Sequence, residues 1–394
     1  MMLLTTFRRV TLLVLSPLLV MTTAVAGHGP ARHAGVSSID VYADGDRVHV
    51  LAASRAAADA PAGLAHQVST DGGQTWSPAV SVGHAQPPPD RASRGMDVQV
   101  AACGDVVVAA WETPGTDRWG GGPMTTAVST DGGKTWAPGP NPADDNATTG
   151  HGFLDLAAAD DTGAFHLVWL DSRTGQQGLR YARSTDDGRT WSANQTLGDP
   201  TCECCWNAVS TFPGGRVSVL YRAKSPRDMA LIESTDGGLT WTPPVTVGEF
   251  NWQFDGCPHV GGTLTATVAG ERHAVVWTGK PTDAGAYHVR APGAGSAWPL
   301  TRLGTPDAWH PDLAARGNVL AATWTEPTGG RQVVHVATSP DAGATWTPPR
   351  QLSKPEAAAS HPRTVPAGDG FLVVWTQRRA GEPARWESHR VSVP

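Results

Sequence analysis

The sequence predicts an all-β protein, a β-propeller built of four-stranded blades, and three observations support this prediction. The motif Ser-x-Asp-x-Gly-x-Thr-Trp occurs five times. A short apolar run that ends in a large aromatic residue recurs between the copies. Outside the N-terminus, no stretch keeps the 3.6-residue apolar period of a helix. Because the motif aspartates are 60, 55, 50 and 105 residues apart, the repeated unit has the length of one blade.

The motif is expected to form the turn between the third and fourth strands of each blade. Its aspartate accepts hydrogen bonds from the amides of the turn, its glycine supplies a positive φ, and its tryptophan packs against the strands. A sixth, eroded copy is expected at residues 293–298. The structural residues of the five intact copies are Asp71 and Trp76, Asp131 and Trp136, Asp186 and Trp191, Asp236 and Trp241, and Asp341 and Trp346.

The apolar runs predict the second strand of each unit, and there are seven of them. Strand-like stretches on either side supply the inner, third and outer strands of an antiparallel blade. We therefore favour seven blades, with six as the alternative. The runs span residues 48–53, 106–111, 165–169, 217–221, 273–277, 319–324 and 371–375.

The N-terminus has the features of an export signal. Arg8 and Arg9 precede an apolar run at 10–20, and the small residues around Ala26 suit a signal peptidase. The run is too short for a membrane span with these flanks. We expect a signal peptide at 1–26, a flexible mature N-terminus at 27–35 and the propeller at 36–394, in a secreted or periplasmic protein.

Composition narrows the class of partner. Only 17% of the residues are charged and the net charge is -6, which argues against a nucleic-acid or acidic-lipid partner. Gly, Pro and Trp are abundant, with 45, 32 and 16 residues respectively, as is typical of an exported β-protein with many turns. We expect a monomer whose partner, if it has one, is a glycan or a small molecule.

The five motif copies resemble the Asp-box (BNR) repeats of the sialidase superfamily, and the resemblance runs from about residue 36 to the C-terminus. It implies a propeller, which usually has six blades in true sialidases. In this family the Asp-boxes lie at the blade periphery, and non-enzymatic propellers carry them too. The resemblance also implies the catalytic set of a sialidase: three arginines that bind a carboxylate, a Tyr nucleophile polarised by Glu, and an Asp acid/base.

The sequence departs from that catalytic set. The early Arg-Ile-Pro segment of the family is absent, and none of Tyr42, Tyr181, Tyr221 and Tyr287 has the late-blade context of the nucleophile. Retaining sialidase chemistry therefore cannot be mapped onto this chain. Whether the protein is an enzyme stays open, and if it is one, the resemblance implies a glycoside hydrolase.

Two sets of charged residues are candidates for other roles. Loops after the second strands carry arginines that suit anion binding, although a solvated surface role is the favoured explanation for each one alone. Carboxylates at or near the inner strands are weak catalytic candidates, and local hydrogen bonding is the favoured explanation. These residues are Arg173, Arg222 and Arg227 in the first set and Asp97, Asp255 and Asp312 in the second.

The segments that lead into the inner strands carry the sharpest signal. Such segments gather at one mouth of a propeller channel, and here they place His151, His310 and His361 at equivalent points of three blades as candidate ligand contacts. Four cysteines and one more histidine lie in the segments of the fourth and fifth blades. This metal-binding set comprises Cys202, Cys204, Cys205, Cys257 and His259.

Two interpretations of the cysteines remain open. Thiolates mixed with imidazoles are typical ligands of copper or zinc, so one of these metals is the only cofactor that we expect. Disulfides persist in exported proteins, and a pairing such as Cys205 with Cys257 is the alternative.

Three functional hypotheses follow. The first is a sialidase-like binding module that lacks classical sialidase chemistry and holds a soft metal, or a metal-organised ligand, at the mouth. The second is an exo-sialidase or another glycoside hydrolase that acts on glycans. The third is a non-catalytic adhesive or structural propeller whose cysteines form disulfides.

Overall fold

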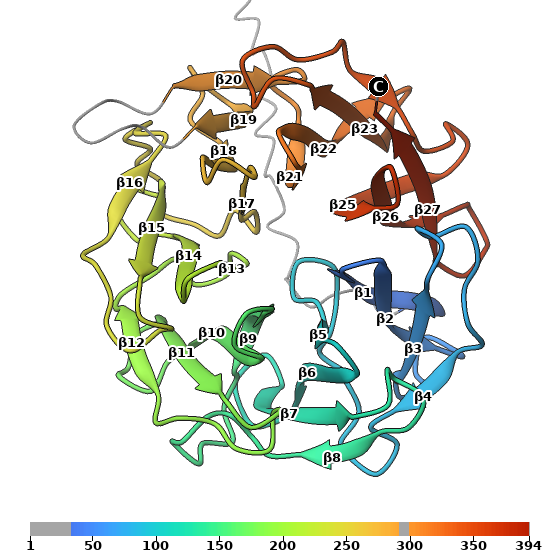
Figure 1. Ribbon diagram of the computed structural model, residues 1–394, viewed down its shortest axis with the longest axis vertical. Coiled ribbons are helices and arrows are strands. Elements are labelled where there is room, and N and C mark those ends of the chain that lie inside the picture. Colours follow the sequence, from blue (N-terminus) through green and yellow to red (C-terminus); the bar gives the residue numbers. More distant parts are fainter. Residues whose placement is uncertain (1–32, 291–298, 394) are drawn as a thin grey trace, which may run out of the picture. The chain divides into compact units, whose positions relative to one another are not determined.

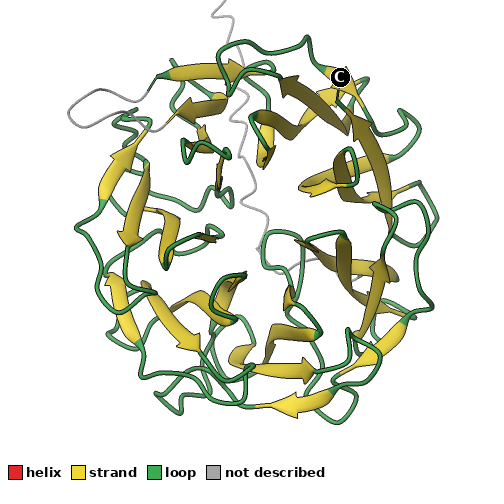
Figure 2. Cartoon of the chain, viewed as in Figure 1, coloured by secondary structure: helices red, strands yellow, loops and turns green. Residues whose placement is uncertain are grey.

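The computed structural model describes residues 33–290 and 299–393. These residues form antiparallel sheets that follow one another around a ring (Figure 1), and they contain strands, turns and loops but no helix (Figure 2). There are seven sheets, so the seven-bladed propeller is confirmed over the six-bladed alternative. The expected signal peptide and the eroded motif copy lie outside the described residues.

Within each blade the strands run in sequence from the channel outward, as predicted. The first blade comprises β1 (Gly35–Asp44), β2 (Arg47–Arg55), β3 (Gly63–Ser69) and β4 (Val80–Val82); the second β5 (Gln99–Cys103), β6 (Val106–Pro114), β7 (Gly121–Ser129) and β8 (Ala137–Gly139). The third comprises β9 (Gly152–Ala159), β10 (Ala164–Asp171), β11 (Gly178–Ser184) and β12 (Gln195–Gly198); the fourth β13 (Ala208–Phe212), β14 (Arg216–Arg222), β15 (Met229–Ser234) and β16 (Val245–Val247).

The remaining blades repeat the pattern with one difference. The fifth comprises β17 (Thr263–Ala266), β18 (Arg272–Thr278), β19 (Gly285–Arg290) and β20 (Leu300–Leu303), and the sixth β21 (Trp309–Arg316), β22 (Val319–Thr328), β23 (Arg331–Ser339) and β24 (Arg350–Gln351). The seventh has three strands in the described residues, β25 (Ala358–Ala367), β26 (Gly370–Arg378) and β27 (Arg385–Ser392).

The ring closes by contact between the first and the last blade. The amide of Val36 donates a hydrogen bond to the carbonyl of Ala384 at 2.8 Å, and the amide of Ala384 donates to the carbonyl of Ala34 at 3.1 Å. All four strands of the first blade come from residues 35–82. Among residues 33–290 and 299–393, no strand of the first blade belongs to the seventh, and these residues supply no fourth strand to the seventh blade.

The Asp-box turns have the predicted hydrogen bonds. In the first copy, Asp71 accepts from the Thr75 amide at 2.9 Å and from the Thr75 hydroxyl at 2.6 Å, and it also accepts from the Ser69 hydroxyl at 2.8 Å. The copies that begin at Ser129, Ser184, Ser234 and Ser339 repeat these three bonds. The aspartate thus replaces backbone partners that the tight turn cannot supply.

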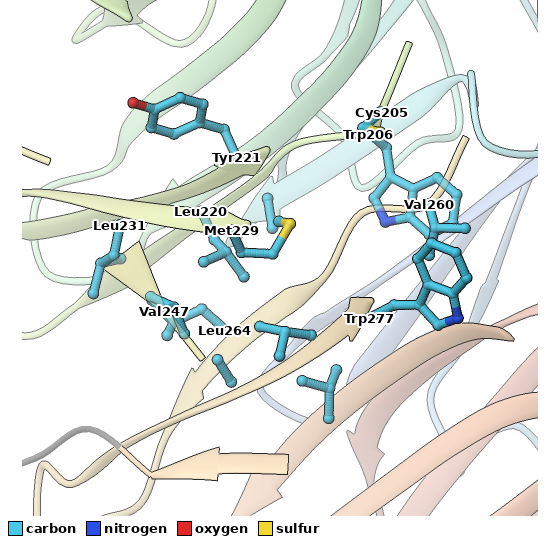
Figure 3. Packing of buried hydrophobic residues seen from close by; sticks show 14 of the residues in the cluster. Cys205, Trp206, Leu220, Tyr221, Met229, Leu231, Val247, Val260, Leu264 and Trp277 are labelled. Carbon is cyan, nitrogen blue, oxygen red and sulfur yellow. The ribbon is translucent and has the colours of Figure 1, made fainter. Parts of the chain in front are cut away.

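Some blades also pack against the Asp-box of the next blade. Trp136 packs edge-on against His66 of the preceding blade with ring centroids 5.3 Å apart, and Trp241 packs against Tyr181 at 4.8 Å. The apolar second strands fill the space between sheets, as Figure 3 shows for Leu220 and Trp277 of the fourth and fifth blades. The motif therefore joins blades as well as turning the chain.

Among the described residues, the structure holds no helix with the length and apolar character that crossing a membrane requires.

Candidate functional site

The lead-in segments share an unusual backbone conformation. Phe153, His259, His310 and His361 have φ values of 55°, 52°, 51° and 51°, in the left-handed region that side chains other than glycine seldom adopt. The strand register shifts between Trp309 and Asp312, and the same happens at His361. A bulge of this kind turns a side chain away from the regular strand alternation. A positive φ recurs at this point in blades three, five, six and seven, which indicates that it is a regular property of the repeat.

These bulges bring rings from several blades into contact. The imidazoles of His310 and His361 stack with centroids 3.7 Å apart, and the indole of Trp206 lies 5.8 Å from each of them. Gly95 of the second blade fits beside them, because a Cβ on it would lie 3.6 Å from Nε2 of His361. We call Gly95, Trp206, His310 and His361 the ring cluster, and it joins lead-in segments of four blades.

The histidines of the ring cluster are uncharged at neutral pH. Burial, together with the charges of Arg94 and Arg363, lowers the pKa of His310 to about 3. The same causes, and the neighbouring His310, hold the pKa of His361 well below its ordinary value. A neutral imidazole can accept a proton or a hydrogen bond, or bind a metal ion.

Beneath the ring cluster lie carboxylates that connect neighbouring inner strands. Asp97 is buried and accepts from Arg94 at 2.7 Å and from Ser38 at 2.8 Å. Asp312 accepts from the amide of Thr364 in the next blade, and burial raises its pKa. Asp97 and Asp312 thus bond partners 59 and 52 residues away in neighbouring blades, and not only the local groups that we expected. Asp255, by contrast, is exposed in the loop before β17.

Sequence reasoning did not single out all of these charges. Arg363 lies 3.6 Å from Asp97 through its side chain, and it attracts Asp40, Asp155 and Asp312 as well. Burial raises the pKa of Asp40 to about 7 and that of Asp155 to about 8. Only the alignment of blades would have revealed this set, because each residue alone is an ordinary strand aspartate or arginine.

Two of the three candidate arginines are internal supports. Arg222 is 1% exposed and donates through all three of its nitrogens to the carbonyls of Val260, Arg227 and Trp277. Arg227 is 2% exposed and donates to the carbonyl of Phe254 and to the carboxylate of Glu203. Arg222 and Arg227 therefore use these donors to hold the protein's own loops together, and the binding role expected of them stays a prediction.

Arg173 and His151 belong to a separate charged cluster. Arg173 bonds Asp171 at 2.7 Å and Asp144 at 2.9 Å. Nε2 of His151 lies 3.1 Å from Asp145, and its Nδ1 lies 2.8 Å from the carbonyl of Thr149. His151 thus bonds carboxylates of its own blade, whereas His310 and His361 stack on each other.

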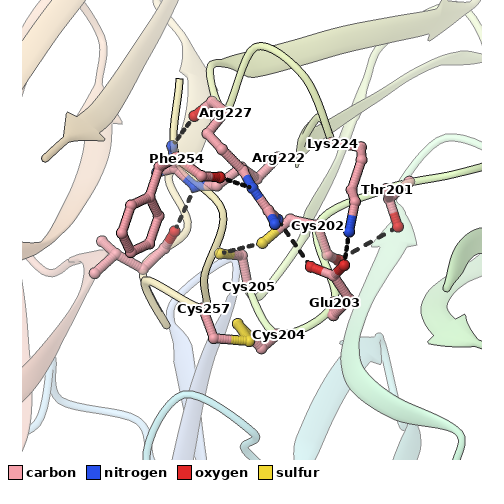
Figure 4. Close-up of a disulfide and its surroundings, with 11 residues drawn as sticks. Thr201, Cys202, Glu203, Cys204, Cys205, Arg222, Lys224, Arg227, Phe254 and Cys257 are labelled. Carbon is pink, nitrogen blue, oxygen red and sulfur yellow. Dashed lines mark hydrogen bonds and ion pairs between the residues drawn. A yellow bond between two sulfur atoms is a disulfide. The ribbon is translucent and has the colours of Figure 1, made fainter. Parts of the chain in front are cut away.

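Three of the clustered cysteines, Cys202, Cys204 and Cys205, lie on the segment that ends at Trp206 of the ring cluster. Cys257 lies on the segment before β17. A disulfide joins Cys204 and Cys257, whose Cα atoms are 5.8 Å apart (Figure 4). Cys202 and Cys205 are free thiols, with their Sγ atoms 3.0 Å apart. The pairing of Cys205 with Cys257 that we offered as an example is therefore wrong. Cys204 and Cys257, expected as thiolate ligands, are bonded to each other because the two lead-in segments meet at these two residues.

Charged side chains surround the free thiols. Glu203 pairs with both Lys224 and Arg227. A hydrogen bond from Cys205 lowers the pKa of Cys202 to about 6, and nearby guanidinium groups also contribute. Burial raises the pKa of Cys205.

The sulfurs have the spacing of a soft-metal site. The Sγ atoms of Cys202, Cys204 and Cys205 all lie within 4.8 Å of one another, and so do the ligand atoms of Cys204, Cys257 and His259. The two triads share Cys204. Cys202, Cys204 and Cys205 are buried, while Cys257 is partly exposed and His259 is exposed. A reduced cluster would offer four thiolates and one imidazole, a donor set that copper or zinc accepts.

Comparison with protein families identifies the fold's relatives. The family described as a BNR repeat-like domain matches residues 63–374. The chain belongs to the BNR repeat-like family. This confirms the resemblance to the sialidase superfamily that the Asp-boxes indicated. No curated protein matches this BNR repeat-like chain.

Several solved structures share the fold of this BNR repeat-like protein. An ulvan lyase, described as a new family of polysaccharide lyase, is 13% identical, with 92% of this chain and 95% of that chain covered and a TM-score of 0.60. A mutant NanB sialidase from Streptococcus pneumoniae is 9% identical, with 92% and 70% covered and a TM-score of 0.53. A protein of unknown function from Dyadobacter fermentans is 16% identical, with 78% and 95% covered and a TM-score of 0.52. At these identities the similarity shows the fold alone.

Proposed function

We propose that this BNR repeat-like protein is an exported metal-binding propeller that lacks retaining sialidase chemistry and holds copper or zinc at its cysteine cluster. One observation carries the proposal: five soft donor groups from two neighbouring blades converge, in two triads whose ligand atoms lie within 4.8 Å of one another. The ligands would be Cys202, Cys204, Cys205, Cys257 and His259. Binding by all four cysteines requires reduction of the Cys204–Cys257 disulfide, since the thiolate and not the disulfide sulfur is the metal ligand.

The tyrosines argue against the sialidase alternative. Tyr42 bonds the backbone of Ala158 between two blades, and Tyr181 bonds His166 within its own sheet. Tyr287 donates to the carbonyl of Asp283, and Tyr221 packs in the core of the fourth blade. Each hydroxyl or ring is thus committed to the fold, so none has the setting of an activated nucleophile.

Metal analysis of the whole chain tests the proposal. The protein is purified without chelator, reduced with a phosphine, loaded with Cu(I) or Zn(II), and desalted before elemental analysis. We expect about one ion per chain, retained against a weak competing chelator. A Cys204→Ser/Cys257→Ser double variant should lose the ion, whereas Cys103→Ser, a cysteine outside the cluster, should keep it. Absence of metal from the reduced, folded wild type would contradict the proposal.

Glycan binding is a second candidate, favoured by exposed aromatic rings. Trp309 is 40% exposed next to His310, and Phe254 is 44% exposed and stacks on Trp252 with ring centroids 5.0 Å apart. Exposed aromatic rings can cover the apolar face of a sugar ring. Quenching of tryptophan fluorescence by acidic oligosaccharides, compared between wild type and Trp309→Ala, tests this role. Turnover of a chromogenic sialoside by the same protein would instead restore the hydrolase hypothesis.

A further inference from the structure

The four clustered cysteines are neither all paired nor all free. Cys204 and Cys257 form a disulfide, and Sγ of Cys204 lies within 4.8 Å of the thiols of both Cys202 and Cys205. The thiols are themselves 3.0 Å apart, about 1 Å more than a disulfide bond. Both are 1% exposed, so bulk oxidants have little access to them. A dithiol held beside a disulfide is the arrangement that thiol–disulfide exchange requires.

We propose that these cysteines form a thiol–disulfide exchange site, in which the Cys202 and Cys205 dithiol reduces the Cys204–Cys257 disulfide. The product is a Cys202–Cys205 disulfide with thiols at Cys204 and Cys257. The spacing Cys202-Glu203-Cys204-Cys205 is the Cys-x-x-Cys spacing of redox-active dithiols.

The exchange balances within the molecule. The Cys202 sulfur loses its proton and attacks Sγ of Cys204, so the Cys204–Cys257 bond breaks and Cys257 leaves as a thiolate that takes up a proton. The Cys205 sulfur then loses its proton and attacks Sγ of Cys202, releasing Cys204, which is protonated in turn. Two thiols are oxidised and one disulfide is reduced, so no outside oxidant or reductant enters the reaction.

The exchange changes which sulfurs face solvent. Before the exchange, the two free thiols belong to the buried Cys202 and Cys205. After the exchange, they belong to Cys204 and Cys257, and Cys257 is partly exposed and lies beside the exposed His259. The step therefore brings a thiol to the surface without an external reductant. This inference does not depend on metal binding, although it would supply thiols to the Cys204, Cys257 and His259 triad that the proposed function invokes.

Tryptic mapping distinguishes the two states. Cys202, Cys204 and Cys205 fall in the peptide 190–216, and Cys257 falls in the peptide 228–272. The Cys204–Cys257 disulfide links these peptides, whereas a Cys202–Cys205 disulfide leaves them separate. Full-length protein that has two free thiols in the cluster is kept in chelator. Its free thiols are then alkylated with a maleimide at low pH, and the protein is digested and analysed by mass spectrometry. Chelator removes the metal, so this result and the metal-loading result are independent.

We expect both peptide patterns in the wild type, with the separate peptides labelled at Cys204 and Cys257. Their proportion should be unchanged by tenfold dilution, because the exchange is intramolecular. Cys202→Ser should lower the labelling of Cys257 by about tenfold or more, and Cys103→Ser should leave it unchanged. Linked peptides alone, with label confined to Cys202 and Cys205, would overturn the proposal. The wild-type map decides this even if a variant fails to fold.

Discussion

The turn glycine Gly133 of the second blade lies directly against the imidazole of His66 in the first blade. A Cβ on Gly133 would come within 2.1 Å of Cε1 of His66. His66 cannot move aside easily, because its Nε2 lies 3.0 Å from Nδ1 of His49 and Trp136 covers its ring. The Asp-box glycine is thus needed for blade contact as well as for its positive φ of 87°.

Replacing Gly133 by alanine should therefore lower the free energy of unfolding by about 3 kcal/mol, because backbone strain and overpacking add. Gly104→Ala is the matched control: its φ is also positive, at 61°, but no atom lies within 4 Å of the added Cβ. It should cost only about 1 kcal/mol. Urea unfolding followed by tryptophan fluorescence measures both, and equal costs would show that blade contact contributes nothing.

Substitution of Arg222 tests whether this side chain stabilises the fold or binds a ligand. Arg222→Met would leave the carbonyls of Val260 and Trp277 buried without their donor, so stability should fall by about 3 kcal/mol. Arg216→Met changes an exposed arginine on the same strand and should alter stability by less than about 0.5 kcal/mol. If Arg222→Met kept full stability and lost only ligand affinity, the anion-binding interpretation would be correct instead.

Asp155 should make stability depend on pH. Burial raises the pKa of Asp155 from its ordinary value of 3.8 to about 8 in the folded protein. Between these values the unfolded chain binds fewer protons, so stability falls as pH rises. Asp155→Asn keeps an acceptor for the Val209 amide and cannot ionise. It should match wild type near pH 4 and exceed it at pH 9 by on the order of 2 kcal/mol.

Denaturant titrations of both proteins at the two pH values check the Asp155 prediction, because other titrating groups are common to both. The exposed Asp46, changed to Asn, should differ from wild type by less than about 0.5 kcal/mol at either pH. A stability difference between Asp155→Asn and wild type that did not grow with pH would mean that Asp155 is ionised in the folded protein.

The sequence predicted those features that depend on local contacts. The Asp71 and Thr75 bonds close within five residues, so the motif alone specifies the turn. The sequence also showed that His310 and His361 recur at equivalent points of two blades, and the structure places them within β21 and β25 with their rings stacked. What the sequence could not predict depends on partners far along the chain. Arg222 is held by carbonyls 38 and 55 residues away.

The choice among cysteine pairings was hidden for a similar reason. Cys202, Cys204 and Cys205 reach the same region on one short segment, so sequence spacing leaves their partners undetermined. Only the fold decides that Cys204 faces Cys257. The left-handed φ of His310 and His361 was equally hidden, because each residue precedes an ordinary strand sequence.

The hydrogen bonds between Val36 and Ala384 have a consequence for the order of folding. Strand pairing within a blade is local, so the early blades can form while later ones are still unstructured. The last blade, by contrast, must find a partner almost 350 residues back along the chain, at a large cost in chain entropy. We infer that ring closure is the late, slow event in folding, and that until then the apolar faces by which the first and last sheets pack on each other are exposed to other chains.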